Sequence, residues 1–124
     1  MMKKILLAED DDFLIDIYSK MLEKVGFEVD IAKTGKECLK KISEKKYHLL
    51  LLDLVLPEID GFQVLKEIKN KKQKREKTAK GLKIVVLSNV MEKDKIDFSL
   101  VDDYFIKAHY TPSQLVKKII ALLE

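Results

Sequence analysis

Two short segments of this chain are apolar at every position. Residues 49–52 and 84–87 consist only of Leu, Ile and Val, and polar residues, Asp53 and Ser88, follow them directly. Successive side chains of a β-strand point to opposite faces of the sheet, so a wholly apolar strand must be covered on both faces. Such strands are typical of a parallel sheet between two layers of helices, and an antiparallel sheet with one wet face is disfavoured.

The rest of the chain alternates between apolar runs and segments of helical periodicity. The runs at 5–8, 29–32 and 103–106 predict three further strands, and a helical segment follows each of the five. Five repeats of strand and helix predict an α/β fold, a doubly wound five-stranded parallel sheet with helices on both faces. The helices are expected at 13–25, 35–42, 61–68, 91–100 (the least periodic) and 112–123.

Length and composition limit the class of protein. The 124 residues are enough for one domain, 1–124, and 47% apolar with 36% charged residues is typical of a soluble globular fold. No apolar run approaches the roughly 18 residues of a membrane span, and the N-terminus lacks the features of a secretory signal. The single cysteine, Cys38, excludes an internal disulfide and is expected in the core. A cytoplasmic protein is therefore expected.

Candidate site residues follow four of the five expected strands. Glu9 and Asp10 come after the first, Asp53 after the third, Ser88 after the fourth and Lys107 after the fifth. Parallel strands end at one edge of the sheet, so these groups are expected to share a rim. Carboxylate oxygens without nearby His or Cys favour Mg²⁺ or Ca²⁺ over zinc, and Mg²⁺ suits a site where a phosphoryl group supplies a further oxygen. An Asp carboxylate can itself act as the nucleophile that becomes an aspartyl-phosphate.

Each of these residues alone also has an ordinary structural explanation. An acidic cluster after a strand often caps the next helix, and Asp11 or Asp12 is expected to do so. A lone Asp at a strand end is usually a loop residue, and a Ser there often caps a turn. The functional interpretation depends on finding all of them at the same edge.

At these residues the sequence resembles the receiver domain of two-component response regulators. The similar stretches are the first strand with its acidic pair (5–11), the phosphoacceptor strand and loop (51–57 with Asp60 and Gly61), the strand that ends at Ser88, and 103–107. The similarity covers essentially the whole chain. It implies a flavodoxin-like sheet with strand order 2-1-3-4-5.

The resemblance also implies a site. Asp53 would be phosphorylated by a sensor histidine kinase or a phosphotransfer protein. Lys107 and Ser88 would contact the phosphoryl group as catalytic residues. The metal ligands for Mg²⁺ would be the side chains of Glu9, Asp10 and Asp53 and the carbonyl of Val55.

The implied function is a phosphorylation-dependent switch. Ser88 would move towards the phosphate and Tyr104 would turn inward, which would change a surface that binds a downstream protein target. The chain would promote its own phosphorylation and slow dephosphorylation without acting on an external substrate. It would be a stand-alone switch, as a monomer or a phosphorylation-dependent dimer.

The sequence departs from the family pattern at several positions. Ala108 stands where Pro is typical, which leaves the peptide isomer at Lys107–Ala108 open. The interval from Ser88 to Lys107 is about three residues short, so the helix at 91–100 and the output surface are expected to be reshaped there. Asn89 replaces a small residue. Val55 and Val90 offer no polar group to orient a hydrolytic water, so slow self-dephosphorylation is expected.

Two other functions remain open at this stage. A degenerate receiver would bind a partner without phosphorylation, although the complete set of site residues argues against it. An aspartyl-phosphate hydrolase would have a related fold, but such enzymes typically need a second acid two residues after the nucleophile, where this chain has Val55. The two histidines, His48 and His109, lack metal-ligand spacing and are expected to have structural roles.

The positive charge is concentrated in one segment. Residues 66–80 hold eight Lys or Arg and two Glu, a local charge of +6, whereas the whole chain carries +3 and the remainder therefore −3. Residues 69–80 have no aromatic side chains for base stacking and no nucleic-acid motif. A solvated, mobile loop is expected there. The alternative is a docking site for an acidic partner, nucleic acid or an anionic surface.

Overall fold

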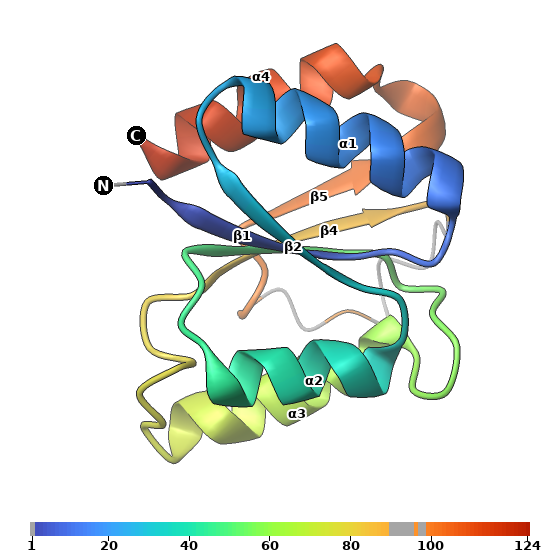
Figure 1. Ribbon diagram of the computed structural model, residues 1–124. Helices are drawn as coiled ribbons and strands as arrows, with labels where there is room; N and C mark the ends of the chain where they lie inside the picture. Colours follow the sequence, from blue (N-terminus) through green and yellow to red (C-terminus); the bar gives the residue numbers. More distant parts are fainter. Residues whose placement is uncertain (1, 90–95, 97–98) are drawn as a thin grey trace.

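Five parallel strands form a single sheet in the order β2-β1-β3-β4-β5 (Figure 1). The computed structural model describes residues 2–89, 96 and 99–124. All four neighbouring pairs of strands are parallel, which confirms the predicted doubly wound sheet and its order. The strands are β1 (Lys4–Ala8), β2 (Glu28–Ala32), β3 (Leu49–Leu52), β4 (Lys83–Ser88) and β5 (Asp103–Ile106).

Helices cover both faces of the sheet. Two of them, α1 (Asp12–Lys24) and α4 (Pro112–Leu123), lie on one face, and α2 (Gly35–Glu44) and α3 (Gly61–Gln73) lie on the other (Figure 1). A short 3₁₀ helix, η2 (Lys107–His109), follows β5. The helix expected at 91–100 lies outside the described residues except for 96, 99 and 100. Within the described part, no helix is both long and apolar enough to cross a membrane.

Local signals in the sequence fix where the helices begin. Asp11 caps α1 by accepting hydrogen bonds from the backbone N–H groups of Phe13 and Leu14, as predicted. Thr34 caps α2 through the N–H of Glu37. At α4, Thr111 and Gln114 form a reciprocal capping box. These caps satisfy backbone donors that have no partner within the helix.

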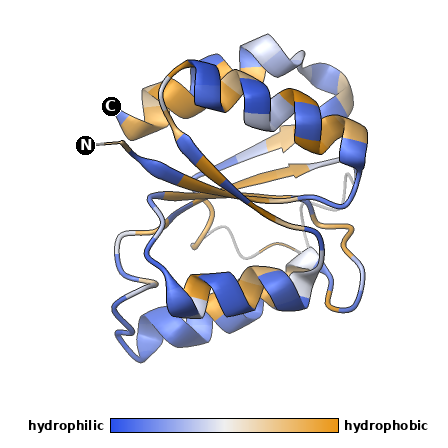
Figure 2. Cartoon of the chain, viewed as in Figure 1, coloured by the Kyte–Doolittle hydropathy of each residue, from blue (hydrophilic) through white to orange (hydrophobic). Residues whose placement is uncertain are grey.

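Alternating side chains of the apolar strands pack into two separate cores. Leu50 and Leu52 of β3 join the cluster under α2 and α3, whereas Leu49 and Leu51 join the cluster under α1 and α4. The sheet and the inward stripes of the helices are accordingly hydrophobic (Figure 2). Cys38 lies fully buried in the first cluster, as expected. This double coverage confirms the inference from the two wholly apolar runs.

The basic segment is only partly a loop. Helix α3 continues to Gln73, so residues 69–73 are helical and the expectation of a loop from 69 was wrong there. Lysine has good helix propensity, and Lys71 and Lys72 in the last turn interact favourably with the negative end of the helix dipole. The turn between α3 and β4 includes Arg75 and Gly81, both with positive φ.

Two smaller expectations are also settled. The Nδ1 atom of His48 accepts a hydrogen bond from the backbone N–H of Lys4 at 2.9 Å, so His48 has the expected structural role next to β1. The peptide bond between Lys107 and Ala108 is trans, like every other peptide bond in the described ranges.

Candidate functional site

The carboxyl ends of four strands bring the predicted polar residues to one edge of the sheet. Ala8 pairs with Leu52 in the register of β1 and β3, so Glu9 and Asp53 follow neighbouring strands at the same level. Ser88 is the last residue of β4 and pairs with Ile106, the residue before Lys107. The parallel arrangement therefore places residues from distant parts of the chain side by side.

Lys107 joins two buried carboxylates. Its Nζ atom donates to Glu9 Oε2 at 2.8 Å and to Asp53 Oδ2 at 2.9 Å. Glu9 is only 2% exposed and Asp53 6%. Ion pairs this far from solvent are weakly screened, and each partner depends on the other for compensation of its charge.

The second oxygen of each carboxylate accepts a backbone hydrogen bond. Glu9 Oε1 accepts from the N–H of Asp11 at 3.2 Å, and Asp53 Oδ1 accepts from the N–H of Val55 at 3.0 Å. The first of these contacts links the site to the N-cap of α1. The second orients the Asp53 side chain directly after its strand, so both carboxylates are held in fixed positions.

Burial changes the protonation equilibria of the site. Burial and, to a smaller extent, the charge of Asp53 raise the pKa of Glu9, and the hydrogen bond and charge of Lys107 lower it, so that the net pKa is about 7. Burial also tends to lower the pKa of Lys107. The hydrogen bonds to Asp53 and Glu9 more than compensate, so the pKa of Lys107 is raised and the side chain stays an ammonium ion.

Three carboxylates form a cluster that fits a divalent cation. Glu9, Asp10 and Asp53 each offer an oxygen atom, and these atoms lie within 4.8 Å of one another. Asp10 is exposed and the other two are buried, so the cluster opens to solvent on one side. Oxygen donors and an open side suit Mg²⁺, which keeps several water ligands. The donor set therefore fits the predicted metal.

Ser88 and Tyr104 lie on the two strands beyond Asp53. Ser88 is fully buried at the end of β4, between the strands that precede Asp53 and Lys107. Tyr104 in β5 is half-buried and packs against the core under α2 and α3, and burial raises the pKa of its hydroxyl. Val55 differs from both because its side chain is 62% exposed beside the Asp53 carboxylate.

Two glycines position the loop after Asp53: Gly61, which belongs to the phosphoacceptor loop motif, and Gly35, which the motif does not include. The N–H of Gly61 donates to the carbonyl of Leu54 at 2.8 Å, and the N–H of Gly35 donates to that of Pro57 at 3.2 Å. A Cβ atom at Gly61 would lie 2.5 Å from Leu54 Cα, and one at Gly35 would lie 1.8 Å from the carbonyl oxygen of Ile59. Helices α2 and α3 can thus begin directly against this loop. In the sequence, a glycine at the start of an apolar helix face was the signal that could have indicated this close approach.

Replacing Gly61 by Ala is expected to destabilise the fold by about 2 kcal/mol, because the new methyl group meets backbone that cannot move aside. The loop that follows Asp53 would be displaced as well. Urea denaturation measures the first effect. The matched control is Asn70→Ala at an exposed position of the same helix, which should change the free energy of unfolding little. Equal stability of Gly61→Ala and wild type would contradict the prediction.

Comparison with known proteins identifies the family. A family model described as the response regulator receiver domain matches residues 5–120. The chain belongs to this family. The predicted resemblance, made on the strand-end motifs, is thereby confirmed.

Curated relatives of this receiver domain are longer proteins. The Bacillus subtilis alkaline phosphatase synthesis transcriptional regulatory protein PhoP is 30% identical over 99% of this chain and 49% of its own length. The Staphylococcus aureus transcriptional regulatory protein SrrA is 34% identical over 99% and 48% respectively. The chain thus spans about half the length of these two relatives, both of which are named as transcriptional regulators.

Solved receiver domains share the fold over nearly the full chain. The CheY-like receiver domain protein from Methanospirillum hungatei has a TM-score of 0.83 and 31% identity, with 99% of this chain and 94% of that chain covered. The response regulator TrrA from Thermotoga maritima, in complex with Mg²⁺-BeF, has a TM-score of 0.82 and 30% identity, with coverage of 98% and 100%.

Membership of the family establishes the general function. The chain is a receiver domain of two-component signalling, that is, a phosphorylation-dependent switch. It is a phosphoacceptor signalling domain and not a classical enzyme. Response regulators interact with histidine kinases and with downstream targets.

Proposed function

We propose that Asp53 is the phosphoacceptor of this receiver domain. The observation that carries the proposal is the position of its carboxylate, which is nearly buried yet held by Lys107 through one oxygen and by the Val55 N–H through the other. A carboxylate fixed in this way is pre-oriented as a nucleophile. Glu9 is also buried and also contacts Lys107, but it sits beside α1 and holds the N–H of Asp11.

The proposed reaction transfers a phosphoryl group from a phosphohistidine of a sensor histidine kinase or phosphotransfer protein. A carboxylate oxygen of Asp53 attacks phosphorus, an O–P bond forms, and the P–N bond of the donor breaks with its electron pair left on the imidazole. Lys107 neutralises negative charge on the phosphoryl oxygens, and its raised pKa keeps the ammonium proton in place. The domain thereby promotes its own phosphorylation.

Glu9, Asp10, Asp53 and the carbonyl of Val55 are the proposed ligands of Mg²⁺. The support for this set is the fit of the three carboxylates to one cation and the position of Val55 next to Asp53. A bound Mg²⁺ supplies charge neutralisation for the incoming phosphoryl oxygens. Lys107 contacts one oxygen of Glu9 and one oxygen of Asp53. The second oxygen of each carboxylate is not bound to the ammonium ion and can serve as a metal ligand.

The proposed switch is Ser88 with Tyr104. A phosphoryl group on Asp53 is nearly dianionic and attracts hydroxyl donors strongly. Ser88 supplies a hydroxyl at the end of β4, which lies between the strands that precede Asp53 and Lys107. Tyr104 lies on β5, next to β4, with its ring half-buried. Movement of Ser88 towards the phosphate would vacate space for the Tyr104 ring and so change the surface that a downstream protein target reads.

An open cavity supports docking of the phosphodonor protein beside the site. A cavity of about 480 Å³ is lined by Lys107 and by the apolar side chains of Phe13 and Ile17, among others. Phe13 is 72% exposed, which is unusual for a large apolar side chain. A donor that contacts Phe13 would bring its histidine close to Asp53. We propose that this encounter takes place in the cytoplasm. We also propose that the domain is a monomer or forms a dimer that depends on phosphorylation.

Intact-mass spectrometry tests the proposed chemistry. The wild-type chain is incubated with a small acyl-phosphate donor, with Mg²⁺ in one sample and a chelator in the other. A switch gains the mass of one phosphoryl group in the Mg²⁺ sample only. Absence of any adduct would support a phosphorylation-independent binding module, and rapid consumption of the donor without an adduct would support an aspartyl-phosphate hydrolase. Either of these results contradicts the proposal.

The phosphorylated form is expected to decay slowly. Val55 is exposed beside Asp53 and presents only methyl groups, so it cannot orient a water molecule for attack on the acylphosphate. Val90, the second residue in this expectation, lies outside the described residues. The decay of the mass adduct in Mg²⁺ buffer measures the lifetime. Val55→Gln should shorten it several-fold and Val55→Ile should leave it unchanged. A wild-type lifetime of seconds would contradict the expectation.

A further inference from the structure

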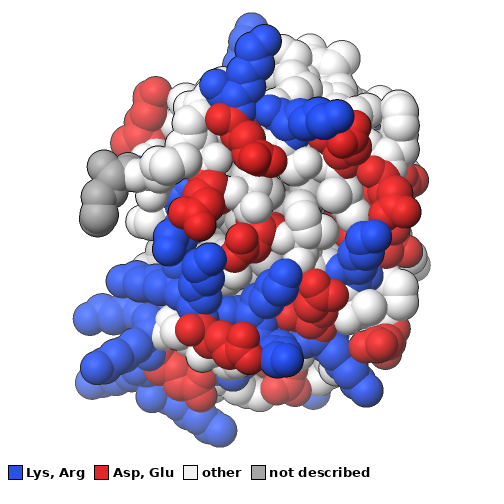
Figure 3. Space-filling model, viewed as in Figure 1, with Lys and Arg blue, Asp and Glu red and all other residues white. Residues whose placement is uncertain are grey.

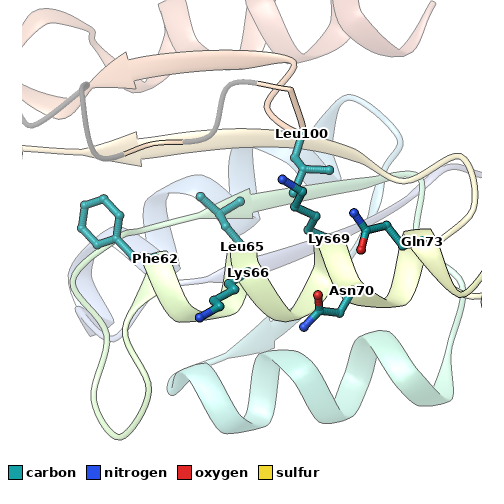
Figure 4. A pocket seen from close by; sticks show the side chains of 7 residues that line it. All are labelled: Phe62, Leu65, Lys66, Lys69, Asn70, Gln73 and Leu100. Carbon is teal, nitrogen blue, oxygen red and sulfur yellow. The ribbon is translucent and has the colours of Figure 1, made fainter.

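A groove runs along the surface of α3. It has a volume of about 420 Å³ and is lined by six α3 residues together with Leu100, which precedes β5 (Figure 4). The six recur at helical spacing from Phe62 to Gln73, so they form one continuous stripe. The twelve residues from Phe62 to Gln73 span about 16 Å along the helix axis, which matches three turns of a partner helix.

The groove combines apolar and cationic side chains. Figure 4 shows Leu65 in the middle of the row and Phe62 at one end, with Leu100 opposite Lys69. Phe62 and Leu100 are partly buried and pack against the core under α2 and α3, and Leu65 is buried. Lys66 is exposed on the outer side of the same stripe. An apolar floor with cationic margins suits a ligand that is itself amphipathic.

Positive charge continues beyond the end of the groove. A second cavity of about 490 Å³ follows directly along the chain and is lined mainly by Lys72, Arg75, Lys77 and Lys80. Lys and Arg side chains gather over the end of α3 and the turn after it, at the lower left of Figure 3. Part of this charge is compensated locally by the ion pair of Lys71 with Glu76 at 3.3 Å. Residues 66–80, which we call the basic strip, carry +6 and the remainder of the chain carries −3. The basic strip is therefore the cationic part of an otherwise acidic molecule.

We propose that the α3 groove binds an acidic amphipathic helix of a partner protein. Its apolar residues, spaced three and four apart, would contact Phe62, Leu65 and Leu100, and its Asp or Glu side chains would pair with Lys66 and Lys69. The charge of the basic strip selects an acidic partner and accelerates association. Phe62 is the one aromatic side chain among the seven residues that line the groove, which offers little for base stacking, so the apolar floor favours a peptide over nucleic acid. This surface lies on the opposite side of the sheet from Phe13, and its use does not depend on the chemistry of Asp53.

Fluorescence anisotropy with a designed probe tests this proposal on the full, unphosphorylated chain. The probe is a labelled 14-residue helical peptide with leucines on one face and glutamates along both margins, and a scrambled peptide of the same composition is its control. Wild type is expected to bind the probe with a dissociation constant on the order of 10 μM that rises with salt, and to bind the scrambled peptide at least about tenfold more weakly.

Charge-reversal variants locate the binding. Lys66→Glu with Lys69→Glu should weaken binding at least about tenfold, and Lys66→Glu alone should act in the same direction. The matched control reverses two exposed lysines on the other helix layer, Lys24 and Lys117, with the same change in net charge and little expected effect. Leu100→Ser tests the apolar floor. Circular dichroism confirms that each variant is folded.

Three results would overturn the proposal. The first is no binding of the probe at 1 mM, and the second is equal weakening by the control pair, which would indicate attraction by net charge alone. The third is tighter binding of a labelled oligo-dT of equal length than of the peptide, together with loss of that binding in the Lys66→Glu, Lys69→Glu double variant. That last outcome would assign the groove to single-stranded nucleic acid.

Discussion

Replacing Asp53 by Asn is expected to abolish phosphorylation by a small acyl-phosphate donor. The amide keeps the size and shape of the side chain but lacks the nucleophilic carboxylate oxygen, so no acylphosphate can form. The adduct should fall from the major species of the wild type to below detection by intact mass. Circular dichroism should remain unchanged, because Asn fills the same space and its single oxygen can still accept the hydrogen bond from the Val55 N–H, although the contact of Lys107 with the second oxygen is lost.

The matched control is the same substitution at Asp16. This carboxylate is exposed on α1 and forms a surface ion pair with Lys20. The Asp16→Asn variant should therefore be phosphorylated to the same extent as the wild type. An adduct on Asp53→Asn at the wild-type level would show that another carboxylate accepts the phosphoryl group. Glu9 and Asp10 would then be the candidates, and peptide mapping after borohydride reduction of the acylphosphate would distinguish them.

The architecture was predictable because it depends on patterns within single segments. A strand with apolar side chains on both faces, such as residues 49–52, has only one stable environment, a covered parallel sheet. The caps at Asp11 and Thr111 likewise depend on residues two or three positions apart. The end of α3 was misjudged because lysine is compatible with both a helix and a solvated loop. Neither charge nor exposure separates the two states.

The location of the site could be predicted, but its interactions could not. Strand ends indicate that Glu9, Asp53 and Lys107 share a rim, whereas nothing in the sequence shows that one ammonium ion bridges both carboxylates. The pKa of Glu9 depends on the packing of the whole edge, which includes β1, β3 and the start of η2. The contacts of Gly35 and Gly61 depend on how closely two helices approach one loop. Such quantities depend on distances between segments far apart in the chain.

The binding partner of the basic segment is another property that could not be predicted from the sequence. Its charge of +6 is evident in the sequence and suggested several partners at once. The structure narrows these alternatives because the lysines at 66 and 69 flank an apolar groove, whereas those further along surround the turn. The side chains next to a lysine decide which ligand its surface suits. Apolar neighbours favour an amphipathic peptide, and further cationic neighbours favour a polyanion.

Replacing Lys107 by Met is expected to lower the free energy of unfolding by about 2–3 kcal/mol at neutral pH in a chelating buffer. The substitution keeps an apolar stem of similar length but removes the only charge that compensates Glu9 and Asp53 within hydrogen-bonding distance in the described structure. Both carboxylates are almost completely buried, so water can replace the ammonium ion only in part. Lys33→Met is the matched control. Lys33 pairs with Asp12 at an exposed position, and its removal should cause no measurable change.

The loss should be larger at pH 8.5 than at pH 6. Burial raises the pKa of Glu9 from its ordinary value of 4.5 to about 7, so the folded state holds this proton more tightly than the unfolded state does. Stability linked to Glu9 is therefore full at low pH and declines as the pH rises through that interval. Without Lys107 the pKa of Glu9 rises further. At pH 6 Glu9 is already largely protonated with or without Lys107, whereas at pH 8.5 it is charged in the wild type and the loss of Lys107 leaves that charge uncompensated.

A second substitution separates charge repulsion from lost packing. Glu9→Gln in the Lys107→Met background removes one of the two uncompensated charges, so it should restore part of the lost stability and flatten the pH dependence. Urea denaturation of the four proteins of this cycle, at both pH values, gives the coupling energy between Glu9 and Lys107. Additive losses at pH 8.5 would show that the two side chains act independently. In that case the ammonium bridge would not hold this edge of the sheet together, and the proposed role of Lys107 would have to rest on phosphoryl transfer alone.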